Sequence, residues 1–206
     1  MALRAAEVDL AVGCTYKYLN AGPGSPAFLY VRSGLQDRLR SPIWGWFSQE
    51  DQFAMGPDYR PVGGIARFLA GTPPVLALAA VESGAAMLAE AGLAAVRAKA
   101  AALTSLAVDL HDERLAPLGF SLGTPRDPAR RGAHVSFRHP DAWRICRALI
   151  ERADVIPDFR APDSIRFGLA PLYTRYVDVW DAIDRLTAIV ESGEHERMDD
   201  ARRRVT

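Results

Sequence analysis

The spacing of apolar residues near the start of the chain predicts two short strands. Apolar side chains occupy alternate positions from residue 8 to residue 12, directly before Gly13, and a period of two is typical of a half-buried strand. A β-prone run at 26–31 follows the glycines and prolines of 21–24 and predicts a second strand. The segment between the two strands is therefore expected to be a turn-rich loop.

A long aromatic segment and two helices are expected next. Residues 41–64 contain aromatic residues, glycine and proline without any period, which favours an ordered loop that lines a site. The following alanine- and leucine-rich stretch extends to about residue 110 and is interrupted at 90–92, which predicts two consecutive helices. We expect Thr72 to cap the first helix, with Pro73 in its opening turn.

The remainder of the chain alternates between strand and helix patterns. Strands are predicted at 134–137 and 164–169, and helices at 141–152 and 177–190. This alternation favours a compact α+β lobe. The charged residues 191–206 contain few large apolar groups and are expected to be a solvated or frayed helix end.

The composition excludes several classes of partner. The 206 residues include 25 basic and 25 acidic side chains, so no net charge attracts nucleic acid or an anionic membrane surface. The longest uncharged apolar stretch, 75–81, is far shorter than the roughly 20 residues that span a bilayer. Cys14 and Cys146 belong to no metal-binding or disulfide pattern, and the histidines show no metal-ligand spacing, so we expect a cytoplasmic protein without a metal.

The residue with the clearest chemical potential is Lys17. It follows the first predicted strand, lies between Tyr16 and Tyr18, and precedes a glycine-rich turn. A lysine that is partly desolvated in such a position can act as a nucleophile and form a Schiff base with an aldehyde. The residue types alone favour a lysine that extends its ammonium group into solvent.

A family resemblance distinguishes between these two interpretations. Residues 13–24 read Gly-Cys-Thr-Tyr-Lys-Tyr-Leu-Asn-Ala-Gly-Pro-Gly, which resembles the pyridoxal-phosphate (PLP) lysine segment of kynureninases, in the class V aminotransferase superfamily. The resemblance implies that Lys17 forms the Schiff base with PLP and later transfers protons. It also implies that Tyr16 reaches the cofactor phosphate and assists proton transfer.

A second segment, 41–47, resembles the Gly-Trp-Phe segment of the same family, in which the tryptophan closes the phosphate site. The resemblance assigns this role to Trp46, whose indole N–H is a donor suited to a phosphate dianion. An aromatic group that only packs the core or an interface is the alternative. The chain departs from the family at Ser48-Gln49, where Gly-His is expected, and two carboxylates follow at Glu50 and Asp51.

The third segment, 63–74, resembles the family region in which a threonine contacts the cofactor phosphate. The resemblance assigns this role to Thr72, and a hydroxyl at the start of a helix suits an anion. Simple helix capping is the alternative interpretation. In the family, the region of Trp46 and Thr72 acts across the interface of a homodimer.

The fourth segment, 164–174, resembles the family segment in which an arginine holds the α-carboxylate of the substrate. Arg166 is the matching residue, in the middle of a predicted strand where an unpaired guanidinium would be costly. The alternative is an internal Asp or Glu partner. Arg175 is a less favoured substitute for the same role.

The resemblance extends to about residue 191 but corresponds only to the carboxy-terminal half of the family's protein. It implies an α/β fold, the C-terminal portion of the PLP-dependent type I (aspartate-aminotransferase-like) fold. Residues 1–90 would be the remainder of the large PLP-binding domain, and residues 91–206 the small C-terminal α+β domain. Because the first half supplies groups that bind the pyridine ring, we expect a truncated or split product that is inactive alone.

The activity implied for the intact enzyme is a step of tryptophan catabolism and NAD biosynthesis. It is hydrolysis of L-kynurenine, or of 3-hydroxykynurenine, to anthranilate, or 3-hydroxyanthranilate, and L-alanine. A non-catalytic fragment or one half of a split enzyme is the first alternative. Another class V enzyme, such as a cysteine-desulfurase relative, is the second, although Cys14 and Cys146 fit the reactive cysteine of such enzymes poorly.

Overall fold

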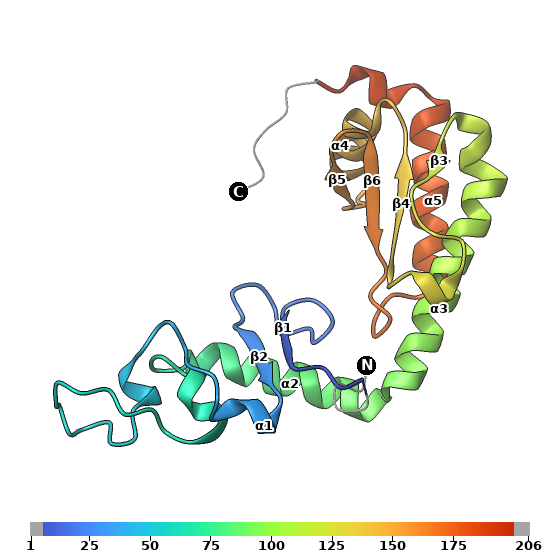
Figure 1. Cartoon of the computed structure of the whole chain (residues 1–206). Helices are drawn as coiled ribbons and strands as arrows, with labels where there is room; N and C mark the ends of the chain where they lie inside the picture. Colours follow the sequence, from blue (N-terminus) through green and yellow to red (C-terminus); the bar gives the residue numbers. More distant parts are fainter. Residues whose placement is uncertain (1–5, 200–206) are drawn as a thin grey trace. The chain divides into compact units, whose positions relative to one another are not determined.

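The chain divides into two compact units, with the boundary between Glu90 and Ala91 (Figure 1). A computed structural model describes residues 6–199 of the chain. Each unit is described by itself below. The identity of the first unit as part of a PLP-binding domain remains a prediction.

The first unit is built on a two-stranded antiparallel sheet. Strand β1 (Leu10–Cys14) pairs with β2 (Ala27–Val31), so both predicted strands are present. The first strand begins two residues later than the pattern indicates. Glu7 has a φ of 51°, and this left-handed conformation interrupts the extended backbone before the strand.

Short helices and one long helix complete the first unit. They are α1 (Ser33–Gln36), the 3-10 turns η1 (Trp46–Ser48) and η2 (Gly64–Phe68), and α2 (Val75–Ala91). The aromatic segment is ordered, as predicted, around the fully buried Ser48. The Ser48 hydroxyl donates to the carbonyl of Gly45 over 2.8 Å and accepts from the Tyr59 phenol over 2.9 Å. The ring of Trp44 stacks on Tyr59 at 4.7 Å between centroids.

The two consecutive helices predicted before residue 110 are confirmed. Helix α2 is followed by α3 (Leu93–Leu110), and Gly92 between them has a φ of 77°, a conformation that favours glycine. The expected cap at Thr72 is wrong, because α2 begins at Val75 and the carbonyl of Pro74 accepts its first-turn bond from Leu78. Residues that precede proline avoid helical backbone, so two successive prolines delay the start of the helix.

The second unit is a four-stranded antiparallel sheet with helices on one side (Figure 1). The strand order is β3-β4-β6-β5, formed by β3 (Ser121–Leu122), β4 (His134–Arg138), β6 (Ser164–Gly168) and β5 (Asp158–Arg160). Helices α3, α4 (Ala142–Arg152) and α5 (Tyr176–Glu191) cover one face. Helical turns η3 (His111–Leu115) and η4 (Ala116–Leu118) extend α3, and η5 (Pro128–Arg130) and η6 (Glu194–Arg197) lie in connections.

The hydrophobic core lies in the second unit. Its fully buried side chains include Leu103, Phe137, Ile145, Ile165 and Leu186. They come from the inner face of the sheet and from all three helices. Strands β4 and β6 contribute apolar side chains at alternate positions, because successive residues of a strand point to opposite faces.

Two expectations about the second unit are wrong. The charged tail 191–206 is expected to be solvated, but His195 and Met198 are buried against the core, because Gly193 reverses the chain with a φ of 67°. Residues 200–206 of this tail lie outside the described residues. The arginine-rich run 126–131 has the composition of a solvated loop, but Arg131 is buried. Neutral oxygen atoms from Pro125 and other residues receive its hydrogen bonds.

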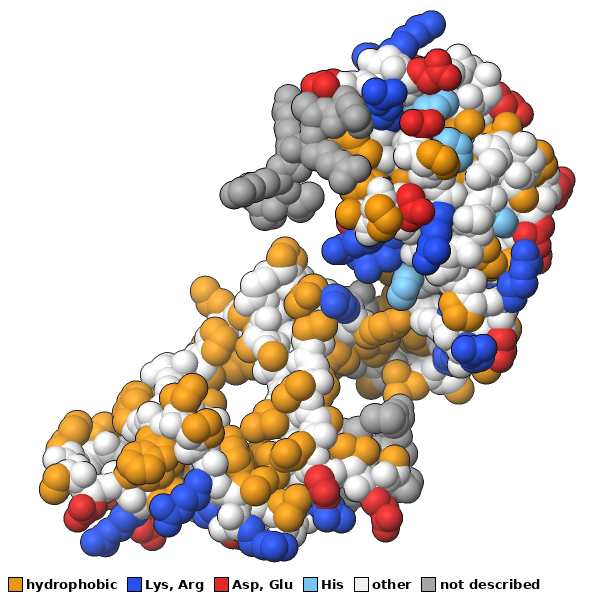
Figure 2. Space-filling view, turned by 45° about the horizontal axis from the view of Figure 1, so that its top comes forward, with side chains coloured by type: hydrophobic (Ala, Val, Ile, Leu, Met, Phe, Trp, Pro, Cys, Tyr) orange, Lys and Arg blue, Asp and Glu red, His pale blue; other side chains and the backbone are white. Residues whose placement is uncertain are grey.

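The first unit buries few apolar side chains by itself. The only hydrophobic residues buried among its described positions are Ala21, Val31 and Leu88. Val12 is 79% exposed and Leu76 is 90% exposed. Figure 2 shows hydrophobic side chains over much of the visible surface of this unit. Such a surface is typical of a region that contacts other protein.

No single helix within residues 6–199 is both long enough and apolar enough to span a bilayer. Only α2 and the helical segment 93–118 taken together reach that length and composition.

Candidate active site

The loop that carries Lys17 connects β1 to β2 and is fixed at both ends. Thr15 is buried, and its hydroxyl donates to the carbonyl of Pro26 over 2.6 Å. The Thr15 carbonyl accepts from the amide of Ala21 over 3.2 Å, and the Lys17 carbonyl accepts from the amide of Asn20 over 3.0 Å. These bonds confine residues 16–20 to a tight turn directly after the strand.

Helix α2 packs closely against the same turn. A Cβ atom at Gly84 would lie 1.9 Å from the carbonyl oxygen of Leu19, so only glycine permits this approach. Leu19 and its neighbours are thus held by the helix as well as by the strands.

The amine of Lys17 is exposed, which differs from the partly desolvated lysine that we expected. The Nζ atom lies 5.3 Å from the centroid of the Tyr16 ring, and no carboxylate in residues 6–199 forms an ion pair with it. Tyr16 and Tyr18 are themselves half-exposed, so they cannot exclude water from the amine. The ammonium group is therefore accessible and has no ionic partner within the part of the chain that is described.

Trp46 presents an indole N–H that no described residue accepts. Its ring makes edge contacts with Phe47 at 4.5 Å and with Phe53 at 6.1 Å between centroids, and it is 46% exposed. The neighbouring Trp44 differs, because its N–H donates to the carbonyl of Ser41 over 2.9 Å. Of these two indoles, Trp46 is the one that can donate to a ligand.

The departure from the family pattern at Ser48-Gln49 has a structural role in this loop. The amide group of Gln49 donates to the Asp58 carbonyl over 3.1 Å and accepts from the Arg60 amide over 2.7 Å. The Asp51 carboxylate accepts from the amide of Phe53 over 3.0 Å. The polar residues after Trp46 therefore hold the loop together.

Thr72 is exposed and lies in the extended segment that precedes α2. In the described chain, no hydrogen bond, ion pair or ring contact joins Lys17 to Trp46 or to Thr72. Two hollows lie elsewhere in the same unit. One is lined in part by Leu29 and Ile65, and the other by Trp44, Tyr59 and Arg67, and neither includes Lys17, Tyr16 or Thr72.

Arg166 lies in the middle of β6, as predicted, and pairs with Asp158 on the neighbouring strand β5. Its side chain is 37% exposed. The internal acidic partner considered for this arginine is thus present, but it contacts only the Nη2 atom. Arg175 is less available than Arg166, because its side chain and its backbone amide both bind the Asp178 carboxylate at the start of α5.

The cysteines offer no accessible reactive thiol in the second unit. Cys146 is buried on α4, and burial raises the pKa of its thiol to about 11, with a further contribution from the Asp158 carboxylate. A thiol with this pKa is protonated near neutral pH and is a poor nucleophile. Cys14 is half-buried within β1.

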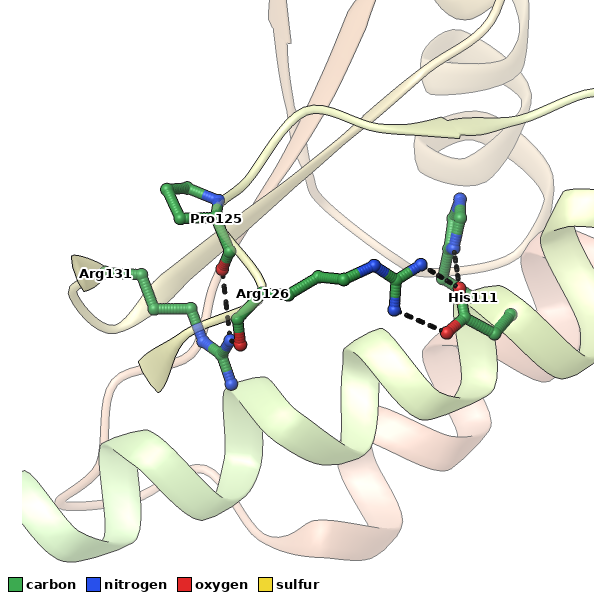
Figure 3. A network of polar contacts seen from close by, with 5 residues as sticks. His111, Pro125, Arg126 and Arg131 are labelled. Carbon is green, nitrogen blue, oxygen red and sulfur yellow. Dashed lines mark hydrogen bonds and ion pairs between the residues drawn. The ribbon is translucent and has the colours of Figure 1, made fainter. Parts of the chain in front are cut away.

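A polar network joins the helical turn η3 to the loop that follows β3 (Figure 3). Arg126 donates to both carboxylate oxygens of Asp112 over 2.6 and 2.7 Å, and His111 Nδ1 lies 2.9 Å from the same carboxylate. The Arg126 guanidinium, with His111, holds the pKa of Asp112 well below its ordinary value. This network stabilises the fold.

Within residues 6–199 there is no group of three or more residues that could hold a metal ion.

Comparison with known proteins identifies relatives over most of the chain. Residues 96–186 match the family model described as the kynureninase C-terminal domain. Kynureninase from Pseudomonas fluorescens is 48% identical over 189 residues, which cover 92% of this chain and 45% of that protein. Kynureninase from Burkholderia mallei (strain SAVP1) is 46% identical over 190 residues, with the same coverage of 92% and 45%. The chain thus spans about half the length of the curated relatives it matches.

Solved structures with a similar fold come from PLP-dependent class V enzymes. The apo cysteine desulfurase from Thermococcus onnurineus NA1 has a TM-score of 0.75 and 18% identity, covering 92% of this chain and 49% of that one. The cysteine desulfurase CsdA from Escherichia coli has a TM-score of 0.72 and 16% identity, covering 92% and 48%. At such low identity the likeness concerns the fold alone. The expected fold class, the C-terminal portion of an α/β PLP-enzyme fold, is confirmed.

Proposed function

We propose, from the premise that this chain belongs to the kynureninase family through its carboxy-terminal domain, that it supplies the Schiff-base lysine of a PLP-dependent hydrolase. The substrate is L-kynurenine or 3-hydroxykynurenine, and the products are anthranilate or 3-hydroxyanthranilate and L-alanine. The observation that carries the proposal is the 48% identity over 189 residues. The structure supports it with an accessible Lys17 amine on a fixed turn.

The residues present fit PLP by the chemistry of their donor groups. Lys17 offers an amine for the aldehyde, and Tyr16 offers a phenol next to it. The free indole N–H of Trp46 and the exposed hydroxyl of Thr72 are donors suited to a phosphate dianion. When bound, PLP supplies the electron sink that carbon–carbon cleavage requires.

In this proposal the protein's own residues bind, orient and move protons. Lys17 holds the cofactor and exchanges protons with the substrate carbon, while Tyr16 donates a proton at the same site. Arg166 binds the substrate α-carboxylate with its planar guanidinium. The exposed apolar surface of the first unit supports a homodimer and contacts with the portion of the family's protein that this chain does not match. We expect that portion to be needed for turnover, and the site of action to be the cytoplasm.

The test uses the fact that the chain contains only two lysines, Lys17 and Lys99. The purified chain is mixed with PLP, reduced with borohydride and digested, and the peptides are analysed by mass spectrometry. We expect a stable pyridoxyl group on Lys17. The Lys99→Arg variant should retain the modification and Lys17→Arg should lose it. Modification of both lysines to the same extent, or of Lys99 alone, would contradict the proposal.

Turnover is tested separately. The chain is combined with a polypeptide equivalent to the unmatched portion of the Pseudomonas fluorescens kynureninase, and anthranilate release from L-kynurenine is followed by fluorescence. Activity that depends on both polypeptides and on Lys17 supports the proposed reaction. Adduct formation without any anthranilate release would favour the non-catalytic fragment.

The desulfurase alternative is disfavoured by the buried, protonated thiol of Cys146.

A further inference from the structure

The four-stranded sheet of the second unit carries its helices on one face and leaves the opposite face without a helix (Figure 1). The strand register places the following side chains on that face: Ser136, Arg138, Asp158, Arg160, Ser164 and Arg166. Three guanidinium groups therefore share this face with one carboxylate. Such an excess of positive charge favours an anionic ligand.

Asp158 is the centre of the charged group on this face. It stands directly opposite Arg166 in the register of β5 and β6. Its Oδ2 atom accepts from Arg160 Nε over 3.0 Å, from Arg160 Nη2 over 2.7 Å, and from Arg166 Nη2. One carboxylate thus serves two guanidinium groups, and this triad retains a net positive charge.

The pairing leaves most of the Arg166 guanidinium available. Only Nη2 contacts Asp158, and no described residue accepts a hydrogen bond from Nε or Nη1. A free arginine side chain samples many rotamers, and ordering it on a ligand costs side-chain entropy. An arginine already held through one nitrogen binds a planar carboxylate with less of that cost.

We infer that Asp158 is a positioning residue, which orients Arg166 so that its remaining N–H groups bind the α-carboxylate of an amino-acid ligand. The inference rests on the proposed function, because it takes Arg166 as the carboxylate-binding residue. Asp158 acts through Arg166 and does not touch the ligand. The competing view is that Asp158 occupies the place of the ligand carboxylate and blocks it.

The two views predict effects of opposite sign. Replacing Asp158 with asparagine removes a negative charge that repels the bound carboxylate, and this change by itself should tighten binding. If Asp158 blocks the site, binding tightens further. If Asp158 orients Arg166, binding weakens in spite of the charge change.

The experiment measures carboxylate binding directly on the full 206-residue chain. Arginine side-chain N–H signals are recorded by ¹⁵N NMR, and the Arg166 signal is assigned by its loss in Arg166→Lys. The chain is titrated with L-alanine and, separately, with ethylamine, which lacks the carboxylate. We expect L-alanine to shift the Arg166 signal, ethylamine to leave it unchanged, and Asp158→Asn to weaken L-alanine binding about tenfold.

Two further variants separate positioning from structural effects. Asp163→Asn makes the same charge change in the turn between β5 and β6, and should alter L-alanine binding by less than about twofold. Asp158→Glu, which keeps the carboxylate, should recover part of the affinity. The backbone amide spectrum of each variant shows whether the second unit remains folded.

The inference is overturned if Asp158→Asn binds L-alanine as well as or better than the wild type, or if L-alanine leaves the Arg166 signal of the wild type unchanged. Neither result bears on the PLP adduct of Lys17, which is measured without any carboxylate ligand. The proposed cofactor chemistry and the positioning role of Asp158 can therefore fail independently.

Discussion

Arg131 buries its guanidinium against Thr104, with its Nε atom 3.0 Å from the Thr104 hydroxyl oxygen. Its other N–H groups donate to the Ser105 hydroxyl. They also donate to the carbonyls of Pro125 and Arg126 (Figure 3). Within the described residues no carboxylate forms an ion pair with it. Burial accordingly lowers the pKa of Arg131, and its guanidinium is stabilised by hydrogen bonds to uncharged oxygen atoms.

The first prediction concerns this buried arginine. Arg131→Ala removes the hydrogen bonds that tie the loop before β4 to helix α3 and leaves their acceptors unpaired. We expect the free energy of unfolding of the second unit to fall by about 2–4 kcal/mol. The free energy of unfolding is measured by urea unfolding of the full chain. Hydrogen exchange at the amides of α3 then shows whether the loss is located in that helix.

The neighbouring Arg130 is the matched control, because it is exposed on the same loop. Arg130→Ala should change the free energy of unfolding by less than about 0.5 kcal/mol. Equal effects of the two variants would show that the Arg131 contacts contribute nothing specific.

The second prediction concerns the pH dependence that Cys146 confers. Burial raises the pKa of its thiol from the ordinary 9.0 to about 11. Between these values the unfolded chain loses the thiol proton and the folded chain keeps it, so stability that is complete below pH 9 declines as the pH rises to about 11. Cys146→Ala should show a smaller decline over this range in urea unfolding experiments. A parallel decline in both proteins would exclude a contribution from the thiol.

The third prediction concerns His139, whose side chain binds the backbone amide of Asp141, the residue directly before helix α4. Its Nδ1 atom accepts from the amide of Asp141 over 3.0 Å, so this nitrogen carries no proton. Burial lowers the pKa of His139 below its ordinary 6.5, an effect that His195 increases and Asp141 opposes. The unfolded chain therefore binds a proton that the folded chain resists, and stability is lost as the pH falls below about 6.5.

The variant that tests this is His139→Asn, because asparagine offers a similar acceptor but does not titrate. We expect this variant to lose less stability than the wild type between about pH 6.5 and pH 5, as measured by thermal unfolding. The imidazole signal of His139 in NMR should titrate below its ordinary pKa. Titration above 6.5 would contradict the proposed effect of burial on His139.

The long helices and the longer strands were predictable because each contains enough residues for the spacing of its apolar side chains to be recognised. The break at Gly92, for example, was visible as a glycine inside an otherwise continuous helical pattern. Strand β5 was missed because it has only three residues, two of them charged, and too little alternation to recognise. That strand provides Asp158, the partner of Arg166, so the sequence alone could not identify it.

Other differences arise from contacts between residues that are distant along the chain. Met198 is a single apolar residue in a charged tail, and its burial depends on the turn at Gly193. The positions of Lys17 and Arg166 within their strands and turns follow from local pattern, whereas the exposure of Lys17 depends on what covers the β1–β2 turn. The chemical roles of both residues remain predictions.

The fourth prediction follows from the unequal distribution of the core between the two units. The connected hydrophobic cluster lies entirely between Leu103 and Met198. The first unit has few buried apolar side chains of its own and many exposed ones. We therefore expect the fragment 91–206 to fold by itself and the fragment 1–90 to remain incompletely folded.

For a domain of this size the free energy of unfolding is expected to be about 5–15 kcal/mol. The fragment 91–206 should show a cooperative urea transition and slow hydrogen exchange at the amides of β4 and β6, because these strands lie at the centre of the sheet. The fragment 1–90 should bind the dye ANS and exchange its amides rapidly. The full chain serves as the reference for both. Loss of cooperativity in 91–206, with retention in the full chain, would mean that the second unit depends on residues 1–90 and that its own core is insufficient.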